Sequence, residues 1–421
     1  MLFPWSNEKN RQNNKKPMVK KNISVLSDCY GCGVCIAACP VKIIKLRENN
    51  DGFYSPVIDA QEKCIECGIC VDVCAFNHKE ICSGKQEPES FAGWSNDANV
   101  RQRCSSGGIG LEVGRHLTSL GFKACGVRYN VKETRAEHYV AETLEEFAQS
   151  AGSKYIPSFS ADAFSQIDRR QKYFVTGTPC QIDSFRRYIR RFNAEDNFVL
   201  LDFFCHGVPS LLLWKKYLKE VEASIGPASF VSWRNKTTGW HDSWSINIDV
   251  VSDCQSVDCH NMYNLGTAEK IHLYQSRWKG GDLFYRFFLE NVCLNRCCYK
   301  SCKYKMASSA ADIRIGDLWG DTYKSDNKGT SAVLALTPKG KEILKSMDGQ
   351  CTLVPESIQT VTEGQMKKSP SLPLIYDKVL SELRGDKTLK EIYGTLIKRY
   401  RIFCIPKRAV RKLRSKFLKK H

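Results

Sequence analysis

The 421-residue sequence lacks an apolar run long enough to cross a membrane. Its first 21 residues are polar and basic, without the apolar core of a secretory signal. No zinc finger, basic zipper or other nucleic-acid signature accompanies the formal net charge of +18. With 42% hydrophobic and 26% charged residues, the rest of the composition is typical of globular proteins. We therefore expect a cytoplasmic protein that binds no nucleic acid.

Cysteine is abundant. Twenty-one cysteines without a signal sequence indicate a reducing compartment and metal ligation rather than disulfides. Eight of them form two similar runs: Cys29-x-x-Cys32-x-x-Cys35-x-x-x-Cys39-Pro40 and Cys64-x-x-Cys67-x-x-Cys70-x-x-x-Cys74. Zinc ribbons use two isolated Cys-x-x-Cys pairs, so this pattern disfavours zinc sites, and a disulfide knot is the other alternative.

The two runs have the spacing of a bacterial two-cluster ferredoxin, in which the fourth cysteine of each run ligates the other cluster. We predict that Cys29, Cys32, Cys35 and Cys74 hold one 4Fe-4S cluster, which we call cluster one. Cys64, Cys67, Cys70 and Cys39 are predicted to hold the second, cluster two. The protein is therefore expected to move single electrons.

The chain is too long for a ferredoxin alone, and its length suggests two or three domains. Residues 22–80 are predicted to form a dicluster ferredoxin domain, the ferredoxin unit, with a hairpin between the two runs. Strand-like and helix-like segments alternate over residues 91–345, which predicts a larger α/β domain with a mixed sheet. Residues 346–421 form a C-terminal extension in which the pattern weakens.

Three loops are candidates for binding phosphate. The predicted strand 173–175 runs through Gly177 into a helix that Thr178 caps and Pro179 begins. Such a free helix N-terminus attracts phosphate, although a turn that needs only glycine and a cap explains the same residues. The segments 105–108 and 328–331 have the same character, and Lys154 is a nearby cation without an evident partner.

A second cysteine group consists of Cys293, Cys297, Cys298 and Cys302. It suggests a third metal or iron–sulfur site, to be weighed against inert cysteines, because its spacing is irregular. Cys104, Cys180 and Cys205 are additional candidate ligands or small packed residues. As ligands of this third site we predict Cys293, Cys298 and Cys302.

His206 follows the most apolar predicted strand, 198–204. A histidine at the carboxyl end of a strand is a candidate proton donor, and His206 is our one catalytic candidate. A histidine that only forms a hydrogen bond within its loop is the alternative.

Seven motifs in this order resemble the coenzyme F420 hydrogenase/dehydrogenase beta subunit family: the ferredoxin run, Arg101-x-x-Cys-Ser-Ser-Gly-Gly108, Gly152-Ser-Lys-Tyr155, Gly177-Thr-Pro-Cys-Gln181, Cys205-His-Gly-Val-Pro-Ser210, Ser301-Cys-Lys-Tyr304 and Ala311-Asp-Ile-Arg-Ile-Gly-Asp317. The resemblance spans about residues 22–340. It implies FAD and electron transfer between iron–sulfur clusters and the flavin. The residues then assigned to the cofactor are Ser105, Ser106, Gly107, Gly108, Lys154, Gly177, Thr178, Pro179, Cys180, Gln181, Lys328, Gly329 and Thr330.

These features together predict an iron–sulfur flavoprotein oxidoreductase that acts on a small molecule, with a redox partner or small-molecule donor. The alternative is an electron-transfer subunit without a substrate of its own.

The segment 398–421 holds eleven Lys or Arg and no acid, interleaved with apolar residues. It is either a solvated tail or a peripheral contact with an anionic membrane surface at the inner face of the membrane.

Overall fold

The computed structural model describes residues 22–26, 28–82, 87–250, 274–300 and 302–403. Most of the basic tail predicted to contact membranes, residues 404–421, lies outside these described residues. In the part of the chain that is described, no helix combines the length and the apolar character needed to span a bilayer.

The ferredoxin unit contains the predicted hairpin. Strands β1 (Ile44–Glu48) and β2 (Tyr54–Ile58) pair antiparallel between the two cysteine runs. The short helices α1 (Val34–Ala38) and α2 (Ile69–Asp72) each contain the third cysteine of a run. Each begins after a glycine with positive φ, Gly33 at 76° and Gly68 at 71°, a conformation that other residues adopt only under strain. Short 3₁₀ turns complete the unit: η1 (Ile23–Val25), η2 (Gln61–Lys63) and η3 (Ala75–Asn77).

A nine-stranded sheet forms the centre of the larger part, in the order β14-β3-β13-β12-β8-β7-β4-β5-β6. Its strands are β3 (Glu89–Ser95), β4 (Lys123–Asn130), β5 (Arg135–Ala141), β6 (Ser158–Phe159), β7 (Tyr173–Thr176), β8 (Phe198–Phe203), β12 (Ile313–Asp317), β13 (Ser331–Ala335) and β14 (Cys351–Pro355). The four central strands β4, β7, β8 and β12 are parallel, whereas β13, β3 and β14 continue the sheet antiparallel. The predicted mixed α/β fold is therefore confirmed.

Helices cover both faces of this sheet because its central strands are apolar on both sides. On one face, α4 (Ile109–Ser119), α5 (Leu144–Phe147) and α11 (Pro338–Ser346) pack over Phe174, Val199 and Leu201. On the other, α6 (Ala161–Gln166) and α7 (Pro179–Arg191) pack over Val175, Leu200 and their neighbours. Further short helices are α3 (Ala98–Arg103), α12 (Ile358–Val361), η4 (Ala148–Ser150) and η5 (Glu195–Asn197).

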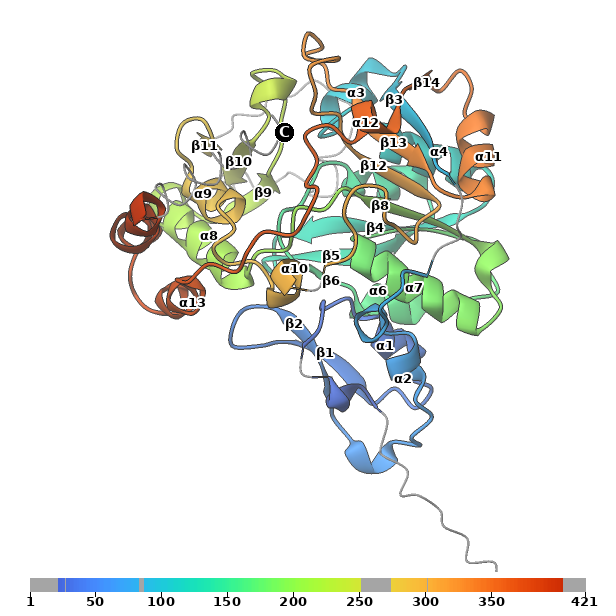
Figure 1. Ribbon diagram of the computed structural model, residues 1–421, viewed down its shortest axis with the longest axis horizontal. Coiled ribbons are helices and arrows are strands. Elements are labelled where there is room, and N and C mark those ends of the chain that lie inside the picture. The colour runs from blue at the N-terminus through green and yellow to red at the C-terminus, as the bar shows by residue number, and fades with distance from the viewer. Residues whose placement is uncertain (1–21, 27, 83–86, 251–273, 301, 404–421) are drawn as a thin grey trace, which may run out of the picture.

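A separate three-stranded sheet, β11-β10-β9, lies beside the large one (Figure 1). Its strands are β9 (Ala228–Ser232), β10 (Ser245–Val250) and β11 (Tyr274–Arg277). Around it lie α8 (Leu211–Ile225), η6 (Trp240–Asp242), α9 (Leu283–Leu289), α10 (Arg296–Lys300), α13 (Tyr376–Arg384), α14 (Leu389–Ile392) and the π-helical segment Tyr393–Ile397. Trp214 of α8, Phe284 of α9 and Leu380 of α13 share one core. The described part of the C-terminal extension, residues 346–403, thus packs on the rest of the chain.

The ferredoxin unit lies below the large sheet and contacts α6 and α7 (Figure 1). Val34 and Ala38 of α1 share a hydrophobic core with Phe164 of α6 and Phe185 of α7. Buried apolar contacts between the two parts fix the positions of the predicted clusters relative to the sheet.

Candidate functional site

A cavity of about 480 Å³ lies at the carboxyl ends of the parallel strands. The cavity is lined by Thr176 at the end of β7, by Phe203 at the end of β8 with Cys205 two residues later, and by Asp317 at the end of β12. In open α/β sheets, ligands bind outside the carboxyl ends of the strands, because loops with free backbone groups meet there. The size of the cavity suits a cofactor or a small substrate.

The structure brings most of the predicted cofactor residues to this cavity. Its lining includes Ser105, Ser106, Gly108, Lys154, Gly177, Thr178 and Gln181, and also His206. The segment 328–330 does not line it. Its carbonyl groups instead accept hydrogen bonds that hold other loops: Lys328 from the Lys236 side chain, and Thr330 from the Ser106 hydroxyl at 2.8 Å.

The two helix N-termini at the cavity differ. At α7, the Gln181 side chain accepts a hydrogen bond from the Thr178 backbone N–H at 2.9 Å, so part of the end is already satisfied. At α4, the N-cap is Gly108 with φ of 93°, and no side chain caps the first turn. An uncapped N-terminus leaves N–H groups and positive partial charge for an anion. The start of α4 is therefore the better phosphate site.

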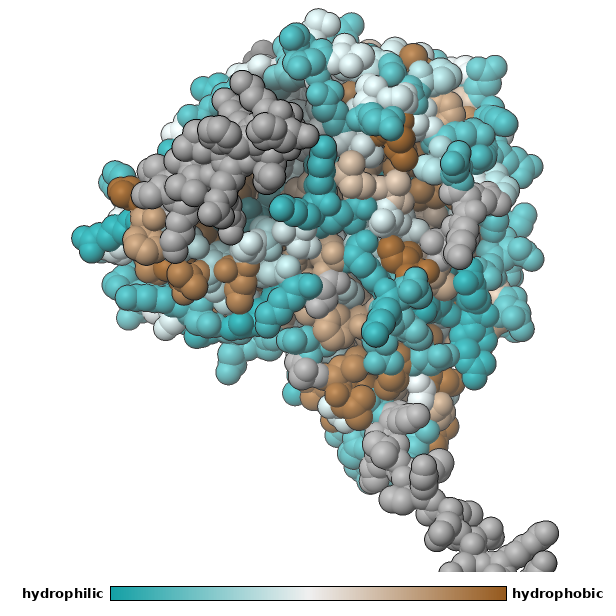
Figure 2. Space-filling view, viewed as in Figure 1, coloured by the Kyte–Doolittle hydropathy of each residue, from teal (hydrophilic) through white to brown (hydrophobic). Residues whose placement is uncertain are grey.

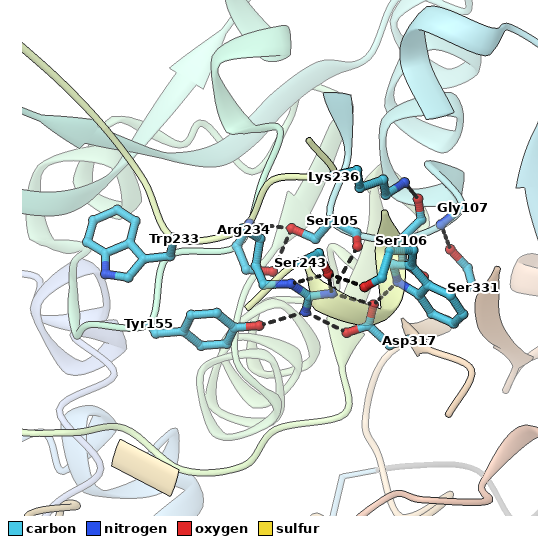
Figure 3. Close-up of polar contacts among 12 residues, drawn as sticks. Ser105, Ser106, Gly107, Tyr155, Trp233, Arg234, Lys236, Ser243, Asp317 and Ser331 are labelled. Atoms are coloured by element: carbon cyan, nitrogen blue, oxygen red, sulfur yellow. Dashed lines mark hydrogen bonds and ion pairs between the residues drawn. The ribbon is translucent and has the colours of Figure 1, made fainter. Parts of the chain in front are cut away.

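The loop before α4 is fixed by a buried arginine (Figure 3). Arg234, whose side chain is fully buried, donates to both carboxylate oxygens of Asp317 at 2.9 and 3.2 Å. It also donates to the Ser105 carbonyl and to the Tyr155 hydroxyl, each at 3.1 Å. Burial opposes the charge of Arg234, but Asp317 and Tyr155 raise its pKa above the usual value. One side chain thus joins three walls of the cavity.

Lys236 has a similar role. Its ammonium group donates to the carbonyls of Arg101, Ser106 and Lys328 at 2.5 to 2.7 Å. Burial lowers its pKa to about 8. Because Arg234 and Lys236 occupy the carbonyls of residues 105 and 106, the backbone of this loop is held in one orientation.

At Gly107 the backbone is too crowded for a side chain: an added Cβ would lie 2.2 Å from the Gly93 carbonyl oxygen.

Lys154 lines the cavity but is already hydrogen-bonded. Its Nζ donates to the carbonyls of Gln149, Ser150 and Ala151 at 3.0 to 3.3 Å. Burial lowers the pKa of Lys154 to about 7. An anion in the cavity would favour the charged form and raise this pKa.

His206 lies partly buried in the cavity wall, and its ring centroid lies 4.9 Å from that of Phe288. Within the described residues, its Nε2 has no hydrogen-bond partner. Burial lowers the pKa of His206 to about 4, so the imidazole is neutral at pH 7, with one ring nitrogen as a donor and the other as an acceptor.

Aromatic rings form other walls of the cavity. Tyr155 stacks on Trp244 with ring centroids 5.0 Å apart, and Trp319 stacks on Trp240 at the same separation. Tyr155, Trp244 and Trp319 all line the cavity, so flat apolar faces stand beside the loop before α4. Such faces suit a planar ring system.

The cysteines predicted for cluster one gather beside α7. Burial raises the pKa of the Cys29 thiol, and the nearby thiols of Cys32 and Cys74 raise it further. Burial also raises the pKa of the Cys35 thiol, and the nearby thiols of Cys32 and Cys29 raise it further. The Gly31 backbone N–H donates to the Cys29 sulfur at 3.0 Å. Four mutually close thiols that would repel one another as free thiolates fit a cluster that binds and neutralises them.

The cysteines predicted for cluster two line a small separate cavity: Cys39, Cys64, Cys67 and Cys70. The Asn22 side chain donates to the Cys64 sulfur at 3.6 Å. Cys67 is exposed, and so are the apolar side chains of Val25, Val41 and Ile65 in the same unit. Figure 2 shows apolar surface gathered on the ferredoxin unit. A predicted ligand of cluster two and several apolar side chains are therefore exposed together at this end of the molecule.

A third group of thiols lies between cluster one and the large cavity. Burial raises the pKa of Cys180 well above its usual value, and Cys205, Cys32 and Cys298 add to the rise. Burial also raises the pKa of Cys298, with further contributions from Cys205 and Cys302. The group therefore consists of Cys180, Cys205, Cys298 and Cys302. We call it the third cysteine group.

Cys293 lies apart from this group. It is buried in the core around α8 and α9, and burial raises its pKa to about 12 without a contribution from any thiol. Cys297 points instead to cluster one, since its sulfur donates to the Cys29 carbonyl at 3.4 Å. Of the three residues predicted for the third site, the structure brings together only Cys298 and Cys302.

Within the described residues, no three His, Cys, Asp or Glu side chains lie close enough to hold a single metal ion. A four-iron cube is wider than one ion, so its four thiolates stand farther apart than the ligands of a zinc ion. All described cysteines are free rather than paired in disulfides.

Comparisons with known proteins concern both parts of the chain. Residues 28–78 match the 4Fe-4S dicluster domain, so the chain is an iron–sulfur protein. Residues 170–359 match the C terminus of the coenzyme F420 hydrogenase/dehydrogenase beta subunit, the family that its motifs resemble. Among solved structures, it is similar to a chain of the F420-reducing NiFe hydrogenase complex from Methanosarcina barkeri, with 18% identity and a TM-score of 0.42 over 73% of this chain and 91% of that chain. A comparison with curated proteins finds no match.

Sequence reasoning missed Arg234 and Lys236, which the structure places at the centre of the loop contacts. The available signal was the segment Trp233-Arg-Asn-Lys236, two cations directly after the apolar strand β9. It also missed Ser184 of α7, whose hydroxyl contacts the Cys32 sulfur, because a single serine inside a helix forms no recognisable sequence motif.

Proposed function

We propose that the protein is an iron–sulfur flavoprotein that passes electrons between 4Fe-4S clusters and an FAD bound in the large cavity, and there reduces or oxidises a small molecule. The observation that carries this proposal is the linear order of the cysteine sets. Cluster two lies at the exposed end, cluster one beside α7, and the third cysteine group between cluster one and the cavity.

The electrostatic influence of neighbouring cysteine sets on one another supports an electron path. The Cys70 thiol of cluster two contributes to the raised pKa of Cys35 in cluster one, whose main cause is burial. Cys32 of cluster one likewise contributes to the raised pKa of Cys180 in the third group, whose main cause is also burial. Cys205, also of that group, lines the large cavity. Each set is thus close to the next.

We further propose that a third 4Fe-4S cluster is held by Cys180, Cys205, Cys298 and Cys302. These residues come from three distant segments, at the start of α7, after β8 and around α10. Convergence of four partly buried thiols from separate elements has no evident packing reason. The nearby Lys305 side chain donates to the Cys205 carbonyl at 3.0 Å and adds positive charge, which suits a site of thiolates.

FAD is proposed for the large cavity because of three features there. The start of α4 is uncapped, the loop 105–108 is held rigidly, and aromatic faces line the adjacent wall. The backbone at Ile109 and Gly110 would receive the phosphates, with Lys154 nearby as a cation. A bound flavin would exchange electron pairs with a substrate and single electrons with a cluster.

His206 is proposed to face the substrate. Its unpartnered Nε2 would form a hydrogen bond with a polar substrate atom and so orient it. We also propose that residues 22–80, 91–345 and 346–421 act as the ferredoxin domain, the flavin domain and an extension. A redox partner would dock on the exposed apolar surface of the ferredoxin unit.

Anaerobic purification with iron, sulfide and flavin analysis tests the proposal. We expect one FAD and iron for three four-iron clusters in each chain. Cys180→Ala should lose one cluster's iron, whereas the matched variant Cys293→Ala should keep all of it. Iron for only two clusters in the wild type, or equal loss in both variants, would contradict the third cluster.

A dithionite-reduced sample then separates the two functions. Reoxidation of the flavin by a deazaflavin or a nicotinamide in the absence of any other protein would support a small-molecule enzyme. Reoxidation only after addition of a partner protein would support the alternative, an electron-transfer subunit.

A further inference from the structure

Helix α7 contacts two of the proposed cluster sites. Cys180 lies in its first turn, and Ser184 lies one turn later, on the same face of the helix. Ser184 is buried, and its hydroxyl lies 3.4 Å from the sulfur of Cys32, a predicted ligand of cluster one. This is a contact between the body of the protein and the ferredoxin unit.

The hydroxyl of Ser184 has a defined orientation. The backbone N–H of Ala75 donates to its oxygen at 3.0 Å, and Ala75 directly follows Cys74, another predicted ligand. One lone pair of the oxygen is therefore used, and its hydrogen remains available for another acceptor.

A serine inside a helix usually donates to a carbonyl of the preceding turn. Ser165 does so to Ala161, and Ser346 to Ile343. Among the described residues, Ser184 forms no such bond, and its hydroxyl instead contacts the Ala75 N–H and the Cys32 sulfur. When Cys32 binds iron, it carries no proton and can only accept. The Ser184 hydroxyl is then the donor of this contact.

We propose that Ser184 donates a hydrogen bond from its hydroxyl to the Cys32 sulfur and so raises the reduction potential of cluster one. A reduced cluster has one more negative charge than an oxidised one, and a donor to its sulfur stabilises the added charge. The flavin domain thereby adjusts how readily the ferredoxin unit accepts an electron. Ser184 is a positioning residue that acts through Cys32, and the inference rests on the proposed cluster at that site.

The test is a redox titration of the intact protein, followed by electron paramagnetic resonance. Ser184→Ala should keep the iron content and shift one reduction wave to lower potential. We expect the ratio of reduced to oxidised cluster at a fixed potential to fall about three- to tenfold, which is about 28 to 59 mV for one electron. The other waves should remain in place.

Ser160→Ala is the matched control. The Ser160 hydroxyl is also buried and also contacts Cys32, but it donates to the backbone carbonyl at 2.9 Å rather than to the sulfur. Removal of the Ser160 hydroxyl should change the ratio of reduced to oxidised cluster at a fixed potential by less than twofold. An equal shift in both variants would show that looser packing, not the bond to sulfur, changes the potential, and would overturn the inference.

If Ser184→Ala binds less iron than the wild type, Ser184→Cys replaces it, because a thiol is a weaker donor. That variant should shift the same wave downward by less. An unshifted or raised wave in an iron-complete variant of either kind would refute the role of Ser184. Absence of the cluster's signal from the wild type would instead refute the proposed cluster, so the two failures are distinguishable.

Discussion

Replacement of Arg234 by methionine should destabilise the protein strongly. Methionine keeps much of the side-chain length but removes the charge and every hydrogen bond. The variant leaves the Asp317 carboxylate with the Trp240 indole N–H, 3.0 Å away, and without its cation. It also frees the Ser105 carbonyl and the Tyr155 hydroxyl from their donor.

The magnitude follows from the burial of the pair. Removal of one partner from a buried ion pair costs about 3–5 kcal/mol, because the other charge stays buried without compensation. The Asp317 side chain is 15% exposed, so water compensates in part, and we expect a cost near the lower end, about 3 kcal/mol. The loop before α4 should also loosen and bind flavin more weakly.

Urea unfolding under anaerobic conditions, followed by tryptophan fluorescence, measures the change in the free energy of unfolding. Arg170→Met is the control, because the Arg170–Asp168 pair lies on the surface and its removal should cause no measurable change. Asp317→Asn completes a double-mutant cycle, in which the double variant should cost about 1–3 kcal/mol less than the sum. A cost below about 1 kcal/mol for Arg234→Met, or an additive cycle, would refute the reasoning.

Three further changes test the cysteine assignments and the cofactor loop. Cys39→Ser should damage the cluster built mainly by the second cysteine run, as seen by iron analysis and spin resonance; loss of the first run's cluster would contradict cross-ligation. Gly107→Ala should lower flavin content about tenfold or more, because the added Cβ meets a backbone oxygen at 2.2 Å, whereas Gly394→Ala, with open space around it, should retain flavin. Because Lys154 has a pKa of about 7 that a bound phosphate would raise, FAD affinity should be constant below pH 7 and fall by up to about tenfold per unit above it. Fluorescence titration from pH 6 to 9 should show that dependence in the wild type and a flat profile in Lys154→Met; a flat wild-type profile would count against the contact.

The sequence alone determined the features that depend on local spacing. The two cysteine runs predicted the dicluster domain, which the family match at residues 28–78 confirms. Alternating apolar segments predicted the hairpin β1–β2 and most strands and helices of the mixed sheet. These predictions succeed because a strand, a helix or a cluster loop is specified by residues within a few positions of one another.

Assembly of the sheets depended on contacts between distant segments. Strand β3 stands near the start of the larger domain, yet it pairs between β13 and β14, which come much later in the chain. Strands β9 and β10 look like further members of the large sheet but form a second one. Strand pairing joins residues far apart in the chain, so periodicity alone does not reveal the partner.

The candidate site shows the same division. Spacing around α10 suggested Cys293, Cys298 and Cys302 as a set, but the fold turns Cys293 into the core and brings Cys180 and Cys205 beside the other two. Likewise, no local pattern pairs Arg234 with Asp317, which are separated by 83 positions but joined by a buried ion pair. The third cysteine group and the Arg234–Asp317 pair form where the ends of β8 and β12 and the start of α7 lie at one edge of the sheet. Side chains from such distant segments meet only after the chain has folded.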